Sequence, residues 1–187
     1  TDGEPILPTP TIGAVGLIND LEKMIDDPAL SGDILVLIGG PGKHLDQSAL
    51  MNEIYSDTTG KPPFTDLQKE KTNGDFILDN LDMINACKDL GTGGVALGAF
   101  KMAQEANLGV SIEDQEIPWY FGEEQGRYLL SLATTEATML CSKANLANVD
   151  ARMIGSFGGD LIKFGKSSIK RSELRIIYLN SLEQALN

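Results

Sequence analysis

The chain has 187 residues and carries 27 acidic side chains against 15 lysines and arginines, for a formal net charge of −12. This length is typical of one domain with a substantial core, and so acidic a chain is poorly suited to bind nucleic acid through its phosphates. Cys87 and Cys141 are too far apart in sequence for a zinc motif or a disulfide framework, and no apolar run approaches the roughly 20 residues that span a bilayer. We therefore expect a cytoplasmic protein with neither nucleic acid nor a membrane as partner.

The amino-terminal segment is predicted to be extended. Thr1 opens the sequence where a Met is usual, and prolines follow at positions 5, 8 and 10, where they fix the backbone and exclude helix. Residues 11–18 (TIGAVGLI) are a glycine-punctuated apolar run that predicts a strand. We expect residue 1 to be an internal position of a longer polypeptide.

A buried strand and a glycine-rich loop come next. A short turn of helix is expected at residues 21–25, and residues 33–39 (DILVLIG) predict a buried strand because the apolar run is continuous and closed by glycine. The loop 39–48 then leads into a short helix over residues 49–55. It resembles an anion-binding loop in kind but lacks the spacing of a P-loop. Its candidate anion-binding residues are Gly39, Gly40, Gly42, His44, Gln47 and Ser48. Ser48 can also cap the helix, and His44 can equally be a solvated or capping residue.

The segment from residue 65 to residue 106 contains the most informative motif. A helix is expected from 65 or 66 towards 81, and a short strand over 83–87. The turn 91–94 follows, with Asp89 at its lip and Gly93 and Gly94 at the start of a helix over 94–105. Backbone N–H groups at such a helix start can face a phosphate, although glycines there can also serve only a tight strand-to-helix connection.

The remaining pattern mixes strands and helices. We expect a strand over 108–112, an aromatic cluster at 118–122 and a strand over 128–133. A helix over 134–148, a hairpin formed by 151–156 and 160–164, and an amphipathic helix from residue 172 complete the chain. Interleaved helices with hairpin-like pairs predict an α+β fold in which a mixed sheet is flanked by helices. We expect residues 1–187 to form one domain.

Three segments occur in an order that resembles one enzyme family. They are residues 6–16 (ILPTPTIGAVG), 89–94 (DLGTGG) and 121–128 (FGEEQGRY), helped by Gly32 and Asp33 before the buried strand. Together they resemble the large subunits of phosphoribosylformylglycinamidine synthases, which belong to the aminoimidazole ribonucleotide (AIR) synthetase superfamily. The resemblance is to the second of two carboxy-terminal domains in those subunits, and it implies the fold of an AIR synthetase carboxy-terminal domain.

The resemblance also implies a reaction and its cofactors. The parent enzymes convert formylglycinamide ribonucleotide, ATP and glutamine-derived ammonia into formylglycinamidine ribonucleotide, ADP and phosphate, and they use Mg²⁺. The positions that match the family's magnesium and substrate motifs are Asp89 and Glu123, Glu124 and Gln125. This chain departs from the motif, because Glu124 stands where the first-copy motif has Ser and adds negative charge beside any phosphate. Cys87 and Lys88 stand where many second copies have a His before the Asp.

Two further readings stay open at this stage. The domain can be a non-catalytic module that packs against the rest of its polypeptide, shapes an auxiliary nucleotide site or docks a glutaminase subunit and a small accessory subunit. For the isolated chain we favour that reading, assign it no catalytic residue and expect it to be inactive alone. The chain can also belong to another superfamily member, of the selenophosphate synthetase or hydrogenase maturation type, but the 121–128 segment argues against that.

Overall fold

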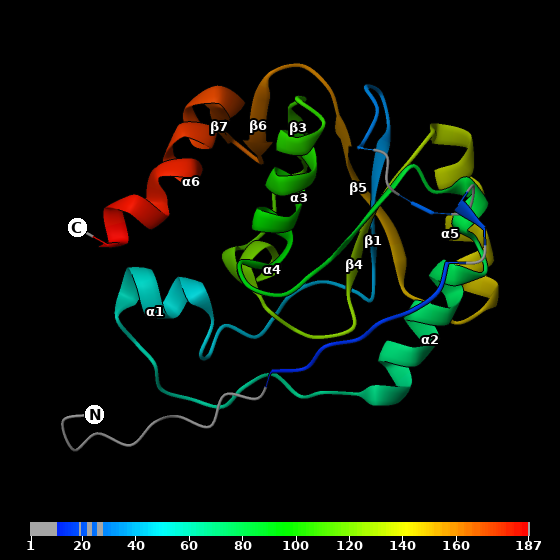
Figure 1. Ribbon diagram of the computed structural model, residues 1–187, viewed down its shortest axis with the longest axis horizontal. Helices are drawn as coiled ribbons and strands as arrows, with labels where there is room; N and C mark the ends of the chain where they lie inside the picture. Colours follow the sequence, from blue (N-terminus) through cyan, green and yellow to red (C-terminus); the bar gives the residue numbers. More distant parts are fainter. Residues whose placement is uncertain (1–10, 19, 22–23, 26–27, 187) are drawn as a thin grey trace.

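The computed structural model describes residues 11–18, 20–21, 24–25 and 28–186. These residues form a seven-stranded sheet in the order β2-β4-β1-β5-β3-β6-β7, flanked by helices (Figure 1). Neighbouring strands are antiparallel except β3 and β6, which are parallel. The sheet is therefore mixed, and the predicted α+β class is confirmed.

The elements have the following bounds. The strands are β1 (Ile34–Ile38), β2 (Ala86–Asp89), β3 (Val110–Ile112), β4 (Tyr128–Leu132), β5 (Ala151–Phe157), β6 (Leu161–Phe164) and β7 (Ser167–Lys170). The helices are α1 (Ala49–Tyr55), α2 (Leu67–Leu78), α3 (Gly94–Glu105), α4 (Ile117–Phe121), α5 (Thr134–Leu146) and α6 (Arg171–Leu186), with a 3₁₀ turn η2 (Leu81–Met83) before β2.

Helices cover both faces of the sheet, and β1 runs between two cores. Leu35 and Leu37 of β1 pack into a cluster with α3 and α4, whereas Val36 and Ile38 pack into a second cluster with α2 and α5 (Figure 1). All four side chains are fully buried. A strand enclosed on both faces has a continuous apolar run in place of alternation, which is the pattern that predicted it.

The start of β1 is held by a buried carboxylate. Asp33 Oδ2 accepts hydrogen bonds from Asn85 Nδ2 at 2.9 Å, from Ser131 Oγ at 2.5 Å and from the Leu30 backbone N–H at 3.2 Å. Asp33 and Ser131 are both buried. The network therefore ties β1 to the end of β4 and to the residue before β2, at the end of the sheet opposite to the loops discussed below.

The predicted hairpin of residues 151–156 and 160–164 is wrong. Both strands exist as β5 and β6, but β3 lies between them and pairs with each. The turn after β5 closes around the start of β3, because Gly109 donates to the Gly159 carbonyl oxygen and Gly158 donates to the Gly109 carbonyl oxygen. The sequence pattern shows two neighbouring strands but not the third strand that separates them.

Several other boundaries differ from the predicted ones. The strand expected over 83–87 begins only at Ala86, after the 3₁₀ turn, and the 118–122 cluster forms helix α4. Residues 167–170 form β7, an unpredicted strand that pairs with β6. The closing helix begins at Arg171, and its apolar side chains do not all face the core, since Ile177 is largely exposed.

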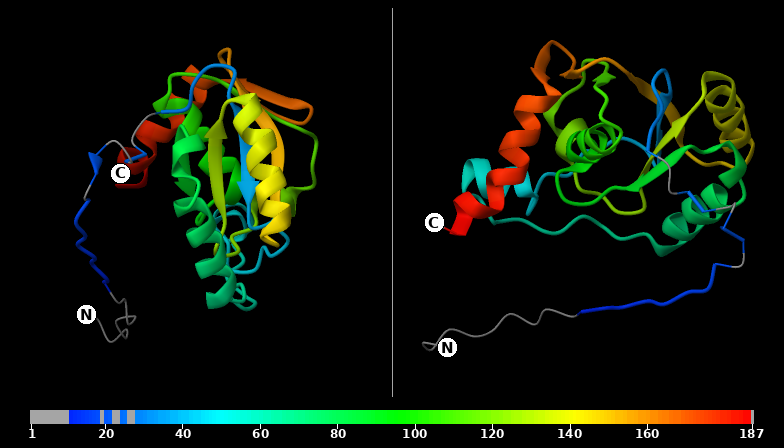
Figure 2. Two further views of the ribbon diagram at one scale, coloured as in Figure 1. Left: turned by 90° about the vertical axis from the view of Figure 1, so that its right-hand side faces the viewer. Right: turned by 45° about the horizontal axis from the view of Figure 1, so that its top comes forward.

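The strand predicted over 11–18 is not formed within this chain. Within the described residues this segment has no strand pairing, and Ile12, Val15 and Leu17 are exposed by 89%, 102% and 86%. Both views in Figure 2 show it running apart from the sheet and helices. The prolines at 5, 8 and 10 and part of the predicted turn at 21–25 lie outside the described residues. Within the described part of the chain, no helix combines the length and the apolar composition needed to cross a membrane.

Candidate functional site

Three loops that the sequence singles out meet at one end of the sheet. β1 ends at Ile38 and β2 ends at Asp89, and both residues pair with Tyr128, the first residue of β4. The segments after β1 and β2 and the segment before β4 therefore leave the sheet side by side. We call these segments, residues 39–48, 90–93 and 122–127, the loop cluster.

Glu123 joins two helix starts through one carboxylate oxygen. Its Oε1 accepts a hydrogen bond of 2.9 Å from the N–H of Ala49, the first residue of α1, and another of 2.9 Å from the N–H of Gly93, which precedes α3. Helix starts have unpaired N–H groups and a partial positive charge, which favour an anion. The anion bound here is the protein's own carboxylate.

Glu124 fills an equivalent role on the 39–48 loop. Its Oε1 accepts hydrogen bonds from the consecutive backbone N–H groups of Lys43 at 2.5 Å and His44 at 2.7 Å. Successive N–H groups that converge on one oxygen form an anion-binding concavity. Glu124 therefore occupies the anion position of the loop that resembles an anion-binding loop in sequence.

A buried arginine stands behind Glu124. The Arg127 side chain is only 1% exposed, its Nη2 lies 3.7 Å from Glu124 Oε2, and its Nε donates to the Glu124 carbonyl oxygen at 3.2 Å. Nη2 also donates to the carbonyl oxygen of Gly122. Burial lowers the pKa of Arg127, and the nearby Glu124 carboxylate opposes this effect. The positive charge offsets the negative charge that Glu124 introduces.

Close backbone packing accounts for two of the predicted glycines. A Cβ on Gly42 would lie 2.6 Å from the Pro118 carbonyl oxygen, and a Cβ on Gly94 would lie 2.6 Å from the Gly122 carbonyl oxygen. Gly94 also has a φ of +58°, which L side chains rarely adopt. Both glycines therefore let α4 and the residue after it approach the loop cluster, and this packing explains them without a ligand.

The other predicted residues of the 39–48 loop have internal partners. His44 Nε2 lies 2.6 Å from the Lys61 carbonyl oxygen, Gln47 Nε2 donates to the Gly60 carbonyl oxygen at 2.9 Å, and Ser48 Oγ caps α1 by accepting from the Met51 N–H. The N–H of Gly39 donates to the Asp150 carbonyl oxygen, and a Cβ on Gly40 would lie 2.9 Å from Asp150 Oδ2. Gln125 is exposed, and its Nε2 donates to the Glu123 carbonyl oxygen at 3.4 Å. The structure thus brings the predicted loop residues together, but as a network within the protein.

Asp89 lies at the edge of this network and faces lysines. Its side chain is 76% exposed and forms an ion pair with Lys88, which together with Lys101 lowers the pKa of the Asp89 carboxyl. Lys88, Asp89 and Lys101 line a hollow of about 190 Å³. Among the described residues there is no group of three or more metal-ligating side chains. A lone carboxylate between ammonium groups lacks the further oxygen ligands that Mg²⁺ requires, so this chain's own residues do not fit that ion.

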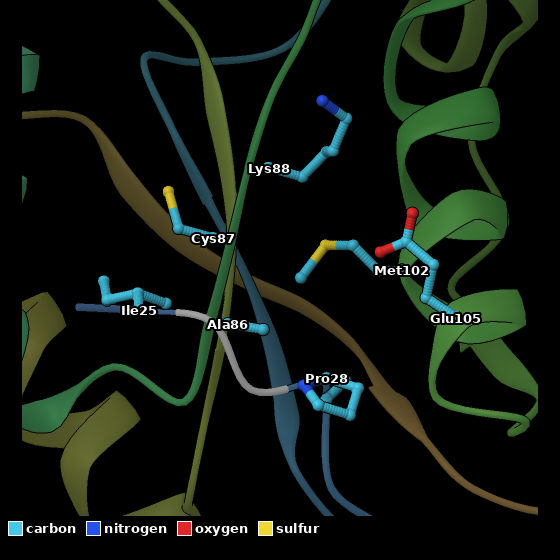
Figure 3. A pocket seen from close by; sticks show the side chains of 8 residues that line it. Ile25, Pro28, Ala86, Cys87, Lys88, Met102 and Glu105 are labelled. Carbon is cyan, nitrogen blue, oxygen red and sulfur yellow. The ribbon is translucent and has the colours of Figure 1, made fainter.

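A larger hollow lies between β2, α3 and the residues Ile25, Pro28 and Ala29. It has a volume of about 380 Å³ and is lined by Lys88, Met102 and Glu105, which lie on the α3 side of β2 in Figure 3. Cys87 projects from the other side of the strand. Cys87 is an exposed residue, but the protein atoms around its thiol partly desolvate it and raise its pKa to about 11, and the Asp89 charge adds to this effect. The thiol is therefore protonated at neutral pH and is a poor nucleophile.

Sequence reasoning missed Arg127, the residue on which the charge balance of the loop cluster depends. One signal was available, since Glu124 and Arg127 are three residues apart and Arg127 directly precedes the buried strand β4. The partners of Glu123 could not be read in this way, because Ala49 and Gly93 are 74 and 30 residues away in sequence.

The fold and the loop cluster match a known domain family. A family model described as "AIR synthase related protein, C-terminal domain" matches residues 31–161. The chain belongs to this family. The match includes β1 to β5, the loop cluster and the first residue of β6.

Among curated proteins, the chain is similar in sequence to the large subunits of one enzyme. The chain is 44% identical over its whole length to the phosphoribosylformylglycinamidine synthase subunit PurL of Ruegeria sp. (strain TM1040), and 42% identical over 98% of its length to that of Jannaschia sp. (strain CCS1). It spans 26% of the length of each of these proteins.

Solved structures share the fold at low sequence identity. Thermotoga maritima PurL complexed with FGAR matches 82% of this chain with a TM-score of 0.70 at 18% identity, and 30% of that chain is covered. A HypE-HypF complex matches 77% of this chain with a TM-score of 0.51 at 17% identity, and 53% of that chain is covered. These likenesses show the AIR synthetase carboxy-terminal fold. The PurL relatives favour the synthase reading over the hydrogenase maturation alternative.

Proposed function

We propose that this chain is the carboxy-terminal quarter of a phosphoribosylformylglycinamidine synthase large subunit. The observation that carries the proposal is the 44% identity to a PurL subunit along the whole chain. The full enzyme would act in the cytoplasm as an amidine-forming, ATP-dependent ligase of purine biosynthesis. It would convert formylglycinamide ribonucleotide, ATP and glutamine-derived ammonia into formylglycinamidine ribonucleotide, ADP and phosphate.

Within that enzyme we assign this domain a structural role. The reaction requires donors and a cation that stabilise a transferring phosphoryl group. In this chain the four loop amides best placed for an anion already donate to Glu123 and Glu124. Asp89 offers Mg²⁺ a single carboxylate beside lysines. ATP, Mg²⁺ and the catalytic groups would therefore be held by the rest of the polypeptide.

The partner of the amino-terminal segment would be the preceding part of the same polypeptide. Ile12, Val15 and Leu17 are exposed apolar side chains on a segment that has the sequence pattern of a strand but no strand partner among the described residues. The PurL relatives are about four times as long as this chain, so they contain the chain length needed to cover the segment. Pairing of residues 11–18 with that part would bury the apolar side chains and satisfy the backbone. A glutaminase and a small accessory subunit would complete the assembly, as the resemblance to the synthase family implies.

The activity can be tested by comparing the chain with the longer polypeptide that contains it. Each would be incubated with formylglycinamide ribonucleotide, ATP, Mg²⁺ and ammonia, and the formylglycinamidine product would be measured. We expect product from the longer polypeptide and none from the 187-residue chain. A longer polypeptide without this activity would refute the assigned reaction, and product from the chain alone would refute the structural role.

A nucleotide titration distinguishes a purely structural role of this domain from a role in forming an auxiliary nucleotide site. Isothermal calorimetry with ADP and Mg²⁺ would be performed on the chain and on the longer polypeptide. Heat of binding with the longer polypeptide alone would support a nucleotide site outside this domain or at its interface. Binding of similar affinity to the isolated chain would refute the interpretation that Glu123 and Glu124 leave no free loop amides for a nucleotide in this domain.

A further inference from the structure

The loop cluster and the first residue of α1 supply four backbone donors suited to anions, and all four have a partner. Lys43 and His44 donate to one oxygen of Glu124, and Ala49 and Gly93 donate to one oxygen of Glu123. Pairs of N–H groups that converge on one oxygen, at a turn and at helix starts, are the arrangement that proteins use to hold phosphate. Here each pair holds a carboxylate from the 122–127 loop.

The two glutamates also connect the exposed helix α1 and the 39–48 loop to the core of the protein. Helix α1 has no buried residue, and its first N–H is held by Glu123. Gly93 leads into α3, whose inner face is buried in the core, so the Glu123 carboxylate links a solvent-exposed helix to a core helix. Glu124 adds the 39–48 loop to the same group and is itself paired with the buried Arg127.

We propose that Glu123 and Glu124 are built-in anions of the loop cluster: each carboxylate occupies the position of an anion at its pair of amides and excludes external anions there, and the two hold the 39–48 loop, α1 and α3 together. An inorganic phosphate that bound at either pair of amides would have to displace the carboxylate held there, and the two negative charges of Glu123 and Glu124 would remain nearby. Arg127 can offset only one of them. The loop cluster is therefore a structural lock.

The first test uses the unmodified chain and depends on no variant. Inorganic phosphate is titrated into ¹⁵N-labelled protein at constant ionic strength, and the amide resonances of Lys43, His44, Ala49 and Gly93 are followed. The lock predicts that none of the four shifts in a saturable manner up to 50 mM phosphate. Saturable shifts of these amides would show an open pocket and would overturn the proposal.

The second test removes one carboxylate. Glu123→Ala should speed hydrogen exchange of the Ala49 and Gly93 amides at least tenfold, lower the melting temperature, and allow phosphate to restore part of that loss in a saturable manner. Glu123→Gln keeps the shape and one acceptor oxygen, so its exchange rates should lie between those of the unmodified protein and Glu123→Ala. The matched control is Glu53→Ala, which removes an exposed glutamate from α1 and should change none of these quantities.

The outcomes of the second test are decisive in either direction. Unchanged exchange at both amides in Glu123→Ala would show that the carboxylate does not hold them and would overturn the proposal. Faster exchange without rescue by phosphate would overturn the claim that the carboxylate occupies a phosphate position. Should Glu123→Ala not fold, Glu123→Gln is judged by the same exchange criterion.

Discussion

Replacing Arg127 by Met tests whether the buried guanidinium organises the loop cluster. The Arg127 side chain is 1% exposed, donates to the Gly122 and Glu124 carbonyl oxygens and lies 3.7 Å from Glu124 Oε2. Removing one partner of a buried ion pair costs about 3–5 kcal/mol. The Glu124 side chain is 25% exposed, so water recovers part of that cost and we expect a loss of about 2–3 kcal/mol.

The loss would be measured by urea unfolding at 25 °C, with the free energy of unfolding taken from linear extrapolation. In a protein of this size, the same loss lowers the melting temperature by about 4–12 °C. The matched control is Arg152→Met. Arg152 is 57% exposed and pairs with Asp150 at the surface, so its loss should cost less than about 1 kcal/mol. A cost for Arg127→Met as small as that of the control would refute the organising role.

A double-mutant cycle identifies the partner charge. Glu124→Gln in the Arg127→Met background removes the carboxylate that the first substitution leaves without its counter-charge. The double variant should therefore be more stable than the sum of the two single changes predicts, by about 1–2 kcal/mol. Additive losses would show that Glu124 and Arg127 do not interact energetically, whatever their separation.

Three further outcomes follow from the geometry. Gly94→Ala should destabilise the fold by about 2 kcal/mol or more, since its Cβ would lie 2.6 Å from a backbone oxygen, whereas Gly91→Ala has open space and should cost less than about 1 kcal/mol in the same urea experiment. Asp33→Ala should cost about 2–4 kcal/mol because it leaves a buried Ser131 hydroxyl without its acceptor, and an unchanged unfolding midpoint would contradict the network. Cys87 should react slowly with iodoacetamide at pH 7 and faster as the pH approaches its pKa of about 11, and a fast reaction at pH 7 would contradict the raised pKa.

Local sequence patterns predicted the strands and helices in which the order of apolar and polar residues matches burial in the fold. The run at residues 34–38 is apolar throughout because both faces of β1 are buried, and the stripe formed by Val95, Ala99 and Met102 packs α3 on the sheet. In these elements the spacing of apolar residues along the sequence agrees with which side chains the fold buries. The predicted mixed sheet followed from how such elements alternate along the chain.

Contacts between distant residues decided what the sequence did not show. The insertion of β3 between β5 and β6 depends on backbone pairing of Val110 with Phe157 and Ile162. No periodicity within residues 151–164 reports that pairing. The strand predicted over 11–18 was wrong for a related reason, because a strand pattern indicates a preference for pairing but does not supply the partner strand.

The sequence predicted the positions of the glycine turns but not the partners of their amides. Glycines at 39, 40, 42, 93 and 94 correctly indicated turns at the ends of strands, and the structure gathers these turns into one cluster. The sequence could not show which groups accept hydrogen bonds from those turns. The acceptors are Glu123 and Glu124, which are between 30 and 81 positions away from the residues they contact. The presence of Glu124 in place of Ser indicated extra negative charge, and Arg127 explains how the fold tolerates it.

The register of the sheet explains why the loops converge as in a phosphate-binding site although the chain's own carboxylates occupy their amides. Ile38, Asp89 and Tyr128 lie in one row because β4 pairs with β1 on one side and β2 on the other, and this pairing depends on the cores and not on the loops. The loops must therefore meet, and their amides need acceptors whether or not a ligand binds, because unpaired N–H groups are costly. Carboxylates from the same chain supply those acceptors permanently, so the helix starts are stabilised without dependence on a ligand.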